Sequence, residues 1–249
     1  MGPSPSEEPR VLLLDIEGTT TPVDFVYQVL FPYARARLAL YAREAASSGA
    51  LGADLDLLRR EHEEDRSRGA NPPTWSSGAA DEELRSLAAY AAWLMDQDRK
   101  STGLKSLQGK IWEAGYRTGR LRGEVYDDVP RAFERWSAQG RRVAIFSSGS
   151  VLAQKLLFGQ STAGDLTGWI ADYFDTTIGA KRDPESYRRI AGALECLPPQ
   201  VLFVSDVVEE LEAARATAMH TATLCVRPGS RRPEAAGMQV IETFDELFR

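Results

Sequence analysis

The chain has 249 residues, 43% of them hydrophobic and 27% charged, and this composition excludes a disordered or fibrous protein. Its 30 basic and 36 acidic side chains give a formal net charge of −6, which disfavours binding to the phosphate backbone of nucleic acids. The only histidines are His62 and His220, so a multi-histidine zinc site or a serine–histidine triad is disfavoured. An enzyme of this composition would work mainly with carboxylates.

The cysteines and the N-terminus indicate the cellular compartment. Cys196 and Cys225 show no CxxC spacing, and we expect them to be small buried apolar residues of a reduced protein. The N-terminus lacks the basic start and apolar stretch of a secretory signal, and no apolar run reaches the length of a membrane span. We therefore expect a cytoplasmic monomer that binds neither nucleic acid nor membranes.

Short apolar runs along the chain predict β-strands. The four clearest runs are Val11–Leu14, Val143–Phe146, Val201–Val204 and Thr221–Val226, with a weaker fifth at Tyr173–Ile178. Each is apolar at successive positions, which is typical of strands buried on both faces of a parallel sheet. Helical patterns at Glu185–Leu197 and Glu209–Met219 separate the last strands, as βαβ crossovers require. The pattern predicts an α/β fold with a doubly wound parallel sheet.

A long helical insertion separates the first strand from the second. Helical periodicity recurs at Ala34–Ala46, Ala53–Glu64, Glu82–Asp96 and Leu104–Gly115. We expect residues 22–125 to form a helical cap domain, and residues 1–21 and 126–249 to form the α/β core. His62 lies in an acidic stretch of this insertion with no second histidine in reach, so we expect it on a solvated helix face.

Polar residues follow the predicted strands, and the carboxyl ends of parallel strands are where function gathers in open sheets. Asp15 and Glu17 follow the first strand, and hydroxyl groups at 147–150 follow the second, at the start of a helix that could cradle an anion. Further along the chain come Lys181, Asp206, Glu209 and Glu210. Carboxylate oxygens suit a hard cation such as Mg²⁺, which can bridge to a phosphate.

Each of these residues also has a purely structural interpretation. Asp15 and the serines at 147–150 could be helix caps, Lys181 a surface lysine, and Glu209 and Glu210 first-turn acids favoured by the helix dipole. Their occurrence in this order at four strand ends favours one shared site.

This ordered set resembles the four motifs of the haloacid dehalogenase superfamily, with Asp15 at the nucleophile, Ser147 at the phosphate-binding Ser/Thr, Lys181 at the Lys and Asp206 at the metal-ligating Asp. Phosphatases of that superfamily usually carry Asp two positions after the nucleophile, whereas this chain has Glu17. The change is shared by the enolase-phosphatase family of methionine salvage. Further segments similar to that family are 15–22, 30–33, 104–109, 147–150, 154–159 and 226–229.

The resemblance implies a phosphatase in which Asp15 forms an aspartyl-phosphate, Glu17 is the acid/base and Lys181 also takes part in catalysis. It further implies that Ser147, Ser148 and Lys181 bind the phosphoryl group. The Mg²⁺ ligands it implies are Asp15, Glu17 through its main-chain carbonyl, Asp206, and Glu210 through a bound water.

By the same resemblance, the substrate is 2,3-diketo-5-methylthiopentyl-1-phosphate, which is enolised and then dephosphorylated. Lys105, Gln108 and Trp112 of the cap are the residues expected to contact its methylthio end. Three alternatives stay open: a phosphatase of another small sugar phosphate, a metal-free dehalogenase, and a non-catalytic phosphate-binding protein. Asp206 and Glu210 argue against the dehalogenase.

Overall fold

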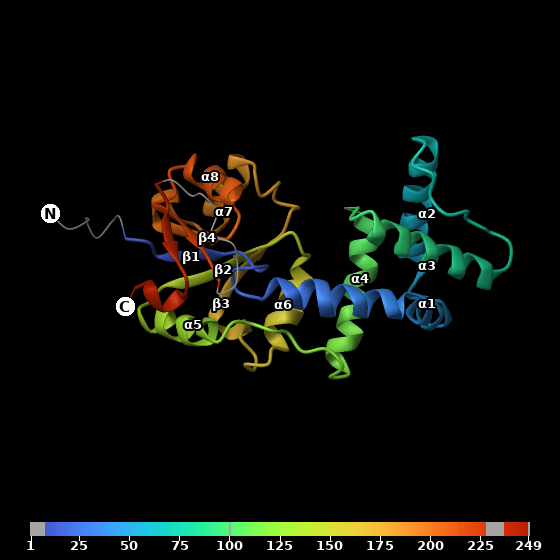
Figure 1. The fold of residues 1–249 in the computed structure, drawn as a ribbon, viewed down its shortest axis with the longest axis horizontal. Helices are drawn as coiled ribbons and strands as arrows, with labels where there is room; N and C mark the ends of the chain where they lie inside the picture. Colours follow the sequence, from blue (N-terminus) through green and yellow to red (C-terminus); the bar gives the residue numbers. More distant parts are fainter. Residues whose placement is uncertain (1–7, 100, 228–236, 249) are drawn as a thin grey trace. The chain divides into compact units, whose positions relative to one another are not determined.

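The computed structural model describes residues 8–99, 101–227 and 237–248. The chain folds into two compact units. One comprises the residues up to Val26 together with those from Arg122 onward, and the other comprises Tyr27–Leu121. The first unit contains the sheet and the second is helical (Figure 1).

A six-stranded sheet is the centre of the first unit. Its strands are β1 (Val11–Leu14), β2 (Arg142–Phe146), β3 (Ile170–Phe174), β4 (Val201–Ser205), β5 (Thr221–Cys225) and β6 (Gln239–Ile241). Their order is β3-β2-β1-β4-β5-β6, and every neighbouring pair is parallel. This is the doubly wound order: the chain runs from β1 through β2 to β3, returns to β4 beside β1, and then continues through β5 to β6. It confirms the predicted fold class.

The strand predictions held for the four clear apolar runs, but the weaker fifth run was misplaced. β3 ends at Phe174, so it covers only the first part of the expected stretch. The strand stops because Asp175 turns the chain: its Oδ1 accepts hydrogen bonds from the Thr177 amide at 2.9 Å and from the Thr177 hydroxyl at 2.6 Å. The short edge strand β6 was not predicted.

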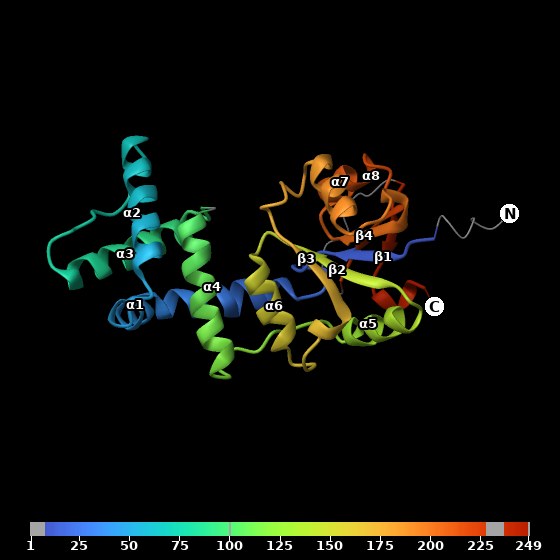
Figure 2. The ribbon, with the colours of Figure 1, turned by 180° about the vertical axis from the view of Figure 1, so that it is seen from behind.

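Helices cover both faces of the sheet (Figures 1 and 2). They are α5 (Asp128–Ala138), α6 (Val151–Gly159), α7 (Pro184–Ala193) and α8 (Val208–Arg215). α7 and α8 share one apolar core with Val11, Leu13 and Phe203, while α5 and α6 meet through Phe133 and Phe158 on the other side. Because alternate strand residues face opposite layers, every residue of β1 is buried.

The helical unit contains α1 (Phe31–Ser47), α2 (Gly52–Ser67), α3 (Ala80–Asp96) and α4 (Thr102–Arg117), and a π-helical segment at Phe25–Leu30 precedes α1. All four predicted helical patterns are helices. Their buried faces share a core that includes Leu38, Leu58, Leu87 and Leu107. Such a core is what lets helices of this length persist in water.

The solvated position expected for His62 is wrong. Its side chain is buried, with ring centroids 5.2 Å from Trp75 and 5.0 Å from Tyr90. Its Nε2 atom lies 2.7 Å from the carbonyl oxygen of Pro73, so the segment that follows α2 covers this face of the helix. Nothing in the acidic sequence around His62 indicates this burial, because Pro73 and Trp75, which cover the ring, lie in a separate, non-helical segment.

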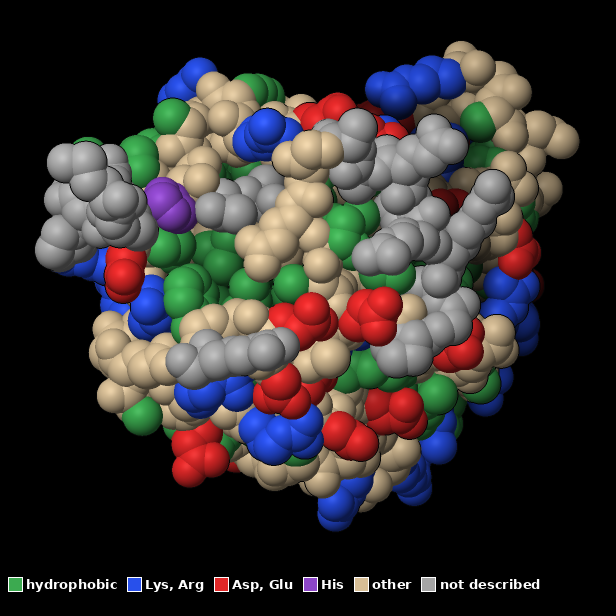
Figure 3. Space-filling model, turned by 60° about the vertical axis from the view of Figure 1, so that its left-hand side comes forward, with side chains coloured by type: hydrophobic (Ala, Val, Ile, Leu, Met, Phe, Trp, Pro, Cys, Tyr) green, Lys and Arg blue, Asp and Glu red, His purple; other side chains and the backbone are tan. Residues whose placement is uncertain are grey.

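The cysteines, the helices and the surface add three observations. Cys196 and Cys225 are both free; Cys225 is buried as expected, whereas Cys196 is only partly buried, so the expectation is wrong for Cys196. Within the described ranges, no helix is both long and apolar enough to cross a membrane. On the face drawn in Figure 3, acidic and basic side chains of the described residues are interspersed.

Candidate active site

The predicted site residues of β1 and β4 lie where the strand order reverses, the usual ligand position in a doubly wound sheet. Asp15 directly follows β1, and its amide donates to the carbonyl oxygen of Val204 in β4 at 3.0 Å. Asp206 directly follows β4. The parallel register places Leu14 beside Val204, so both carboxylates leave the same edge of the sheet.

The Asp15 carboxylate is buried and held from several directions. Its Oδ1 accepts hydrogen bonds from the Ile16 amide at 2.8 Å and from Lys181 Nζ at 2.6 Å. Its Oδ2 accepts a longer bond from the Ser205 hydroxyl at 3.4 Å. A carboxylate fixed in this way is preorganised as a nucleophile or as a metal ligand.

Lys181 connects two carboxylates that come from different strand ends. Its ammonium lies 2.6 Å from Asp15 and 2.7 Å from Glu210 Oε2, and its side chain is only 11% exposed. Burial by itself would lower the pKa of Lys181, but the charges of Asp15 and Glu210 outweigh burial and raise it. The interpretation of Lys181 as a surface lysine is therefore wrong.

Negative charge is in excess among Asp15, Asp206, Glu210 and Lys181. Burial and the charge of Asp15 raise the pKa of Glu210 to about 7, despite its bond to Lys181. Burial and the charge of Asp15 also raise the pKa of Asp206 to about 6. The site therefore has more negative than positive charge, a condition that a bound cation would relieve.

The residues at this edge fit a divalent cation. Asp206 Oδ1 is buried and has no hydrogen-bond partner among the described residues, although a buried carboxylate oxygen normally has one. Gly18 lies against the same carboxylate, since a Cβ at this position would come within 2.2 Å of Asp206 Oδ2. Glu17 is near enough to contribute to the raised pKa of Asp206.

Side-chain ligands alone would not complete such a site. Across the part of the chain that the structure describes, no three His, Cys, Asp or Glu side chains come together as a metal cluster. A cation here would take two carboxylates directly, Asp15 and Asp206, and fill its remaining positions with main-chain carbonyl oxygens and water. Mg²⁺ is commonly bound in this way.

The serine cluster follows β2, the strand beside β1. Ser147 is buried, its amide donates to the carbonyl oxygen of Phe174, and its hydroxyl accepts a bond from the Gly149 amide at 3.2 Å. Ser150 caps α6 by accepting a bond from Ala153. Ser148 lies between them in this turn. The serines predicted to cradle an anion therefore lie in a turn at a helix N-terminus, and anion binding there stays a prediction.

The three residues expected to contact the methylthio end all lie on α4 of the helical unit. Gln108 is buried there, and the indole N–H of Trp112 donates to the carbonyl oxygen of Leu30 at 2.9 Å. Lys105 lies on the same helix. Their role toward substrate stays a prediction.

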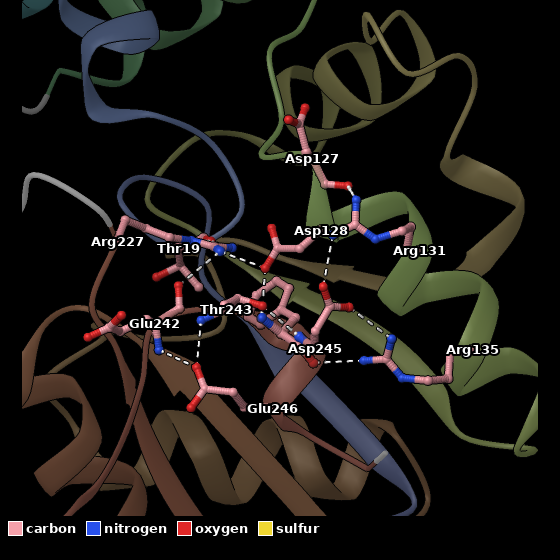
Figure 4. A network of polar contacts seen from close by, with 11 residues as sticks. Thr19, Asp127, Asp128, Arg131, Arg135, Arg227, Glu242, Thr243, Asp245 and Glu246 are labelled. Atoms are coloured by element: carbon pink, nitrogen blue, oxygen red, sulfur yellow. Dashed lines mark hydrogen bonds and ion pairs between the residues drawn. The ribbon is translucent and has the colours of Figure 1, made fainter.

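Three residues of this site carried no role in the sequence analysis. Ser205 donates toward both Asp15 and Glu210, and Gly18 allows the close approach to Asp206. Arg227 donates to the carbonyl oxygen of Thr19, in the loop that follows Asp15 (Figure 4). Ser205 and Gly18 adjoin predicted site residues, which is a signal that could have found them. Arg227 lies in the segment 226–229 that is similar to the family, but no local pattern marks its contact with Thr19, which is 208 positions away in the chain.

A family comparison agrees with this geometry. Residues 9–217 match the model of the haloacid dehalogenase-like hydrolases. The strand order, the buried Asp15 carboxylate after β1 and the carboxylates after β4 thus occur in a chain whose sequence matches this class. The protein is a haloacid dehalogenase-like hydrolase.

Individual relatives show to which family of these hydrolases the chain belongs. The chain is 53% identical to "Enolase-phosphatase E1" of Synechococcus elongatus, over 95% of this chain and 96% of that one. It is 41% identical to the "Probable bifunctional methylthioribulose-1-phosphate dehydratase/enolase-phosphatase E1" of Populus trichocarpa, over 96% of this chain and 47% of that longer one. The crystal structure of the UTR4 protein of Saccharomyces cerevisiae superposes with a TM-score of 0.78 at 31% identity, over 96% of this chain and all of that one. Within the hydrolase class, the chain belongs to the enolase-phosphatase E1 family.

Proposed function

We propose that this enzyme converts 2,3-diketo-5-methylthiopentyl-1-phosphate to 1,2-dihydroxy-3-keto-5-methylthiopentene and phosphate. A proton first leaves C1 while the C2 oxygen gains one, and the phosphate of the resulting enol is then hydrolysed. The observation that carries the proposal is the buried Asp15 carboxylate, bonded to Lys181 at a sheet edge rich in negative charge, in a chain of this family.

The fused relative in Populus trichocarpa supports this choice of substrate. Its name joins a methylthioribulose-1-phosphate dehydratase to an enolase-phosphatase. Loss of water from a ketose 1-phosphate with neighbouring hydroxyl groups gives a 2,3-diketone that keeps its phosphate on C1. Such a product has an acidic C1–H for enolisation and a phosphoester for hydrolysis, which are the two reactions that the name enolase-phosphatase joins.

Asp15 is the proposed nucleophile. Its oxygen attacks phosphorus in line, and the bond between phosphorus and the ester oxygen on C1 breaks. An aspartyl-phosphate remains until water hydrolyses it. Glu17, two residues further along the same loop, gives a proton to the leaving oxygen and later takes one from the attacking water. The bonds from Ile16 and Lys181 hold the carboxylate of Asp15 in one orientation for this attack.

Ser147, Ser148 and Lys181 are the proposed ligands of the transferring phosphoryl group. Hydroxyl and ammonium donors that are already in place stabilise the charge that develops on its oxygens. Lys181 would exchange part of its contact with Asp15 for the phosphoryl oxygens as substrate enters. Its hydrogen-bonded main chain, where Tyr187 donates to the Lys181 carbonyl oxygen at 2.6 Å, keeps the base of its side chain fixed.

Asp15, Asp206 and the main-chain carbonyl of Glu17 would hold a divalent cation, for which we propose Mg²⁺, and Glu210 would order its water. Its chemistry when bound is neutralisation of the phosphoryl oxygens and of the enediolate oxygens. The buried Asp206 oxygen that lacks a partner and the excess of negative charge support this assignment.

The test is incubation with the synthetic diketone phosphate, with ultraviolet absorbance and free phosphate followed together, with and without Mg²⁺. We expect absorbance from the enol and release of phosphate, both dependent on Mg²⁺. Phosphate release from other sugar phosphates without an enol signal would instead indicate a phosphatase of different substrate. No phosphate from any ester would indicate a binding protein.

A further inference from the structure

Arg227 is a buried arginine that reaches the loop of the nucleophile from the distant end of the chain. Its side chain is almost fully buried, with the residue 3% exposed. Both Nε and Nη2 donate to the carbonyl oxygen of Thr19, with the Nε bond at 2.9 Å. Its Nη1 forms an ion pair with Asp128 Oδ2 at 2.7 Å (Figure 4). The guanidinium fork thus connects the loop to the start of α5.

The loop that Arg227 holds extends from Asp15 to Thr21 and carries both Asp15 and Glu17. Inside the loop, the Ile16 carbonyl oxygen accepts bonds from the amides of residues 19, 20 and 21. The Thr20 hydroxyl donates to the carbonyl oxygen of Asp15 at 3.0 Å. A displacement of Thr19 would therefore be transmitted to Asp15 through these bonds, and to Gly18, which lies against Asp206.

Arg227 is itself held rigidly. Its guanidinium carbon lies 4.1 Å from the ring centroid of Tyr126 and 4.6 Å from that of Phe244. Asp128 Oδ2 also accepts a bond from the Phe244 amide at 2.7 Å, so the partner carboxylate is fixed as well. Burying such a pair is a costly way to gain stability, because apolar side chains of similar volume often serve as well. The geometry instead suits a rigid donor that fixes one peptide group.

We propose that Arg227, oriented by Asp128, is a positioning residue for phosphoryl transfer, and that it acts by fixing the Thr19 carbonyl and with it the loop of Asp15 and Glu17. The proposal rests on the proposed phosphatase function. It assigns Arg227 no contact with substrate. Its loss should therefore lower kcat more than it changes KM.

Arg135 provides a matched control in the same network (Figure 4). This α5 residue donates to Asp245 Oδ1 at 3.1 Å and to the carbonyl oxygen of Phe244 at 2.7 Å. It thus ties the same C-terminal segment to the same helix, but among the described residues its hydrogen bonds go to 244–247 and not to the loop of residues 15–21. Arg135→Met removes an attachment of that segment without removing the bonds to Thr19.

The experiment compares Arg227→Met, Arg227→Lys and Arg135→Met with the wild type in kcat, KM and thermal unfolding. We expect Arg227→Met to lower kcat by about 10- to 100-fold, the scale of a small misplacement of reacting groups. KM should change by less than about threefold, because no substrate contact is removed. Arg227→Lys should recover part of the rate, since an ammonium can donate to the Thr19 carbonyl or to Asp128 but lacks the fork that reaches both. Arg135→Met should keep kcat within about twofold even where its unfolding temperature falls.

Hydrogen exchange supplies a readout that does not depend on turnover. In the wild type, the amides of residues 19–21 should exchange as slowly as those of the central strands. The reason is that the Ile16 carbonyl accepts their hydrogen bonds and Arg227 fixes the Thr19 carbonyl. In Arg227→Met, this peptide should exchange faster than it does in Arg135→Met. Fast exchange of residues 19–21 in the wild type would overturn the proposal, even if neither Arg227 variant folded.

The rates are measured on the diketone phosphate and on a simple aryl phosphate, so that the two proposals can fail separately. A wild type that hydrolyses only the aryl phosphate would contradict the proposed substrate and leave the role of Arg227 to be decided on that ester. A folded Arg227→Met with wild-type kcat would overturn the positioning role. An equal loss of kcat in Arg135→Met would also overturn it, because the effect would then be one of general stability.

Discussion

Lys181 Nζ lies 2.6 Å from Asp15 Oδ1, although the two residues are 166 positions apart in the chain. The same ammonium lies 2.7 Å from Glu210 of α8. The side chain of Lys181, which follows β3 in the chain, thus contacts both the end of β1 and the helix after β4. These contacts leave the site with more negative than positive charge. Substitution of Lys181, Asp15 or Asp206 would therefore change the charge balance of the same site.

Lys181→Met should lower the rate of phosphate release by about 100- to 1,000-fold, because a preorganised donor to the transferring group is lost. The measurement is steady-state phosphate release at saturating Mg²⁺. Lys155→Met is the matched control, since Lys155 is exposed and its ammonium lies over the ring of Tyr173, 5.5 Å from the centroid. Equal activity of the two variants would remove Lys181 from the site.

Asp15→Asn should separate the two half-reactions. An amide oxygen attacks phosphorus poorly, so phosphate release should fall by about 10⁴-fold or more. Enolisation needs no covalent bond to Asp15 and should persist at a reduced rate, because Asn is a weaker cation ligand than a carboxylate. With the diketone phosphate and excess Mg²⁺, absorbance should rise without free phosphate.

Two outcomes for Asp15→Asn would contradict this scheme. Normal phosphate release would mean that Asp15 is not the nucleophile. Loss of both signals, with Mg²⁺ binding shown to be intact, would mean that Asp15 also takes part in proton transfer.

Asp206→Asn should weaken cation binding without unfolding the chain. In the wild type, Mg²⁺ should raise the unfolding temperature, because a ligand that binds only the folded state stabilises it. This shift should be largely lost in Asp206→Asn and retained in Glu209→Gln, which removes a charge from an exposed neighbour on α8. An unchanged Mg²⁺ titration of Asp206→Asn would contradict the metal assignment.

Gly18→Ala should abolish most activity and weaken the Mg²⁺ response. Its φ is +73°, and the new Cβ would come within 2.2 Å of Asp206 Oδ2, so the carboxylate must move. Gly140→Ala is the control, since its φ is +72° and a Cβ there meets no atom within 4 Å. Both variants should lose about 1–2 kcal/mol of stability from the left-handed backbone, and only Gly18→Ala should lose activity. Similar activities would show that the approach of Gly18 to Asp206 is not required.

Much of the fold could be predicted from the sequence, because its signals are local. Val11–Leu14 and Val201–Val204 are apolar at every position, which only strands covered on both faces require. The residues that directly follow those strands, Asp15 and Asp206, could then be predicted at one edge of a parallel sheet. Local signals did not predict where β3 ends, because its end depends on the side chain of Asp175 rather than on an apolar pattern.

Only the tertiary structure decided which distant groups meet. His62 looks solvated in sequence and is buried, because a later segment covers it. Lys181 contacts Glu210 as well as Asp15, and Arg227 holds Thr19 from just after β5, although no local pattern marks either contact. The physical reason is that hydrophobic periodicity depends on neighbours in the chain, whereas pairing of buried charges depends on what the packed sheet brings within a few ångströms.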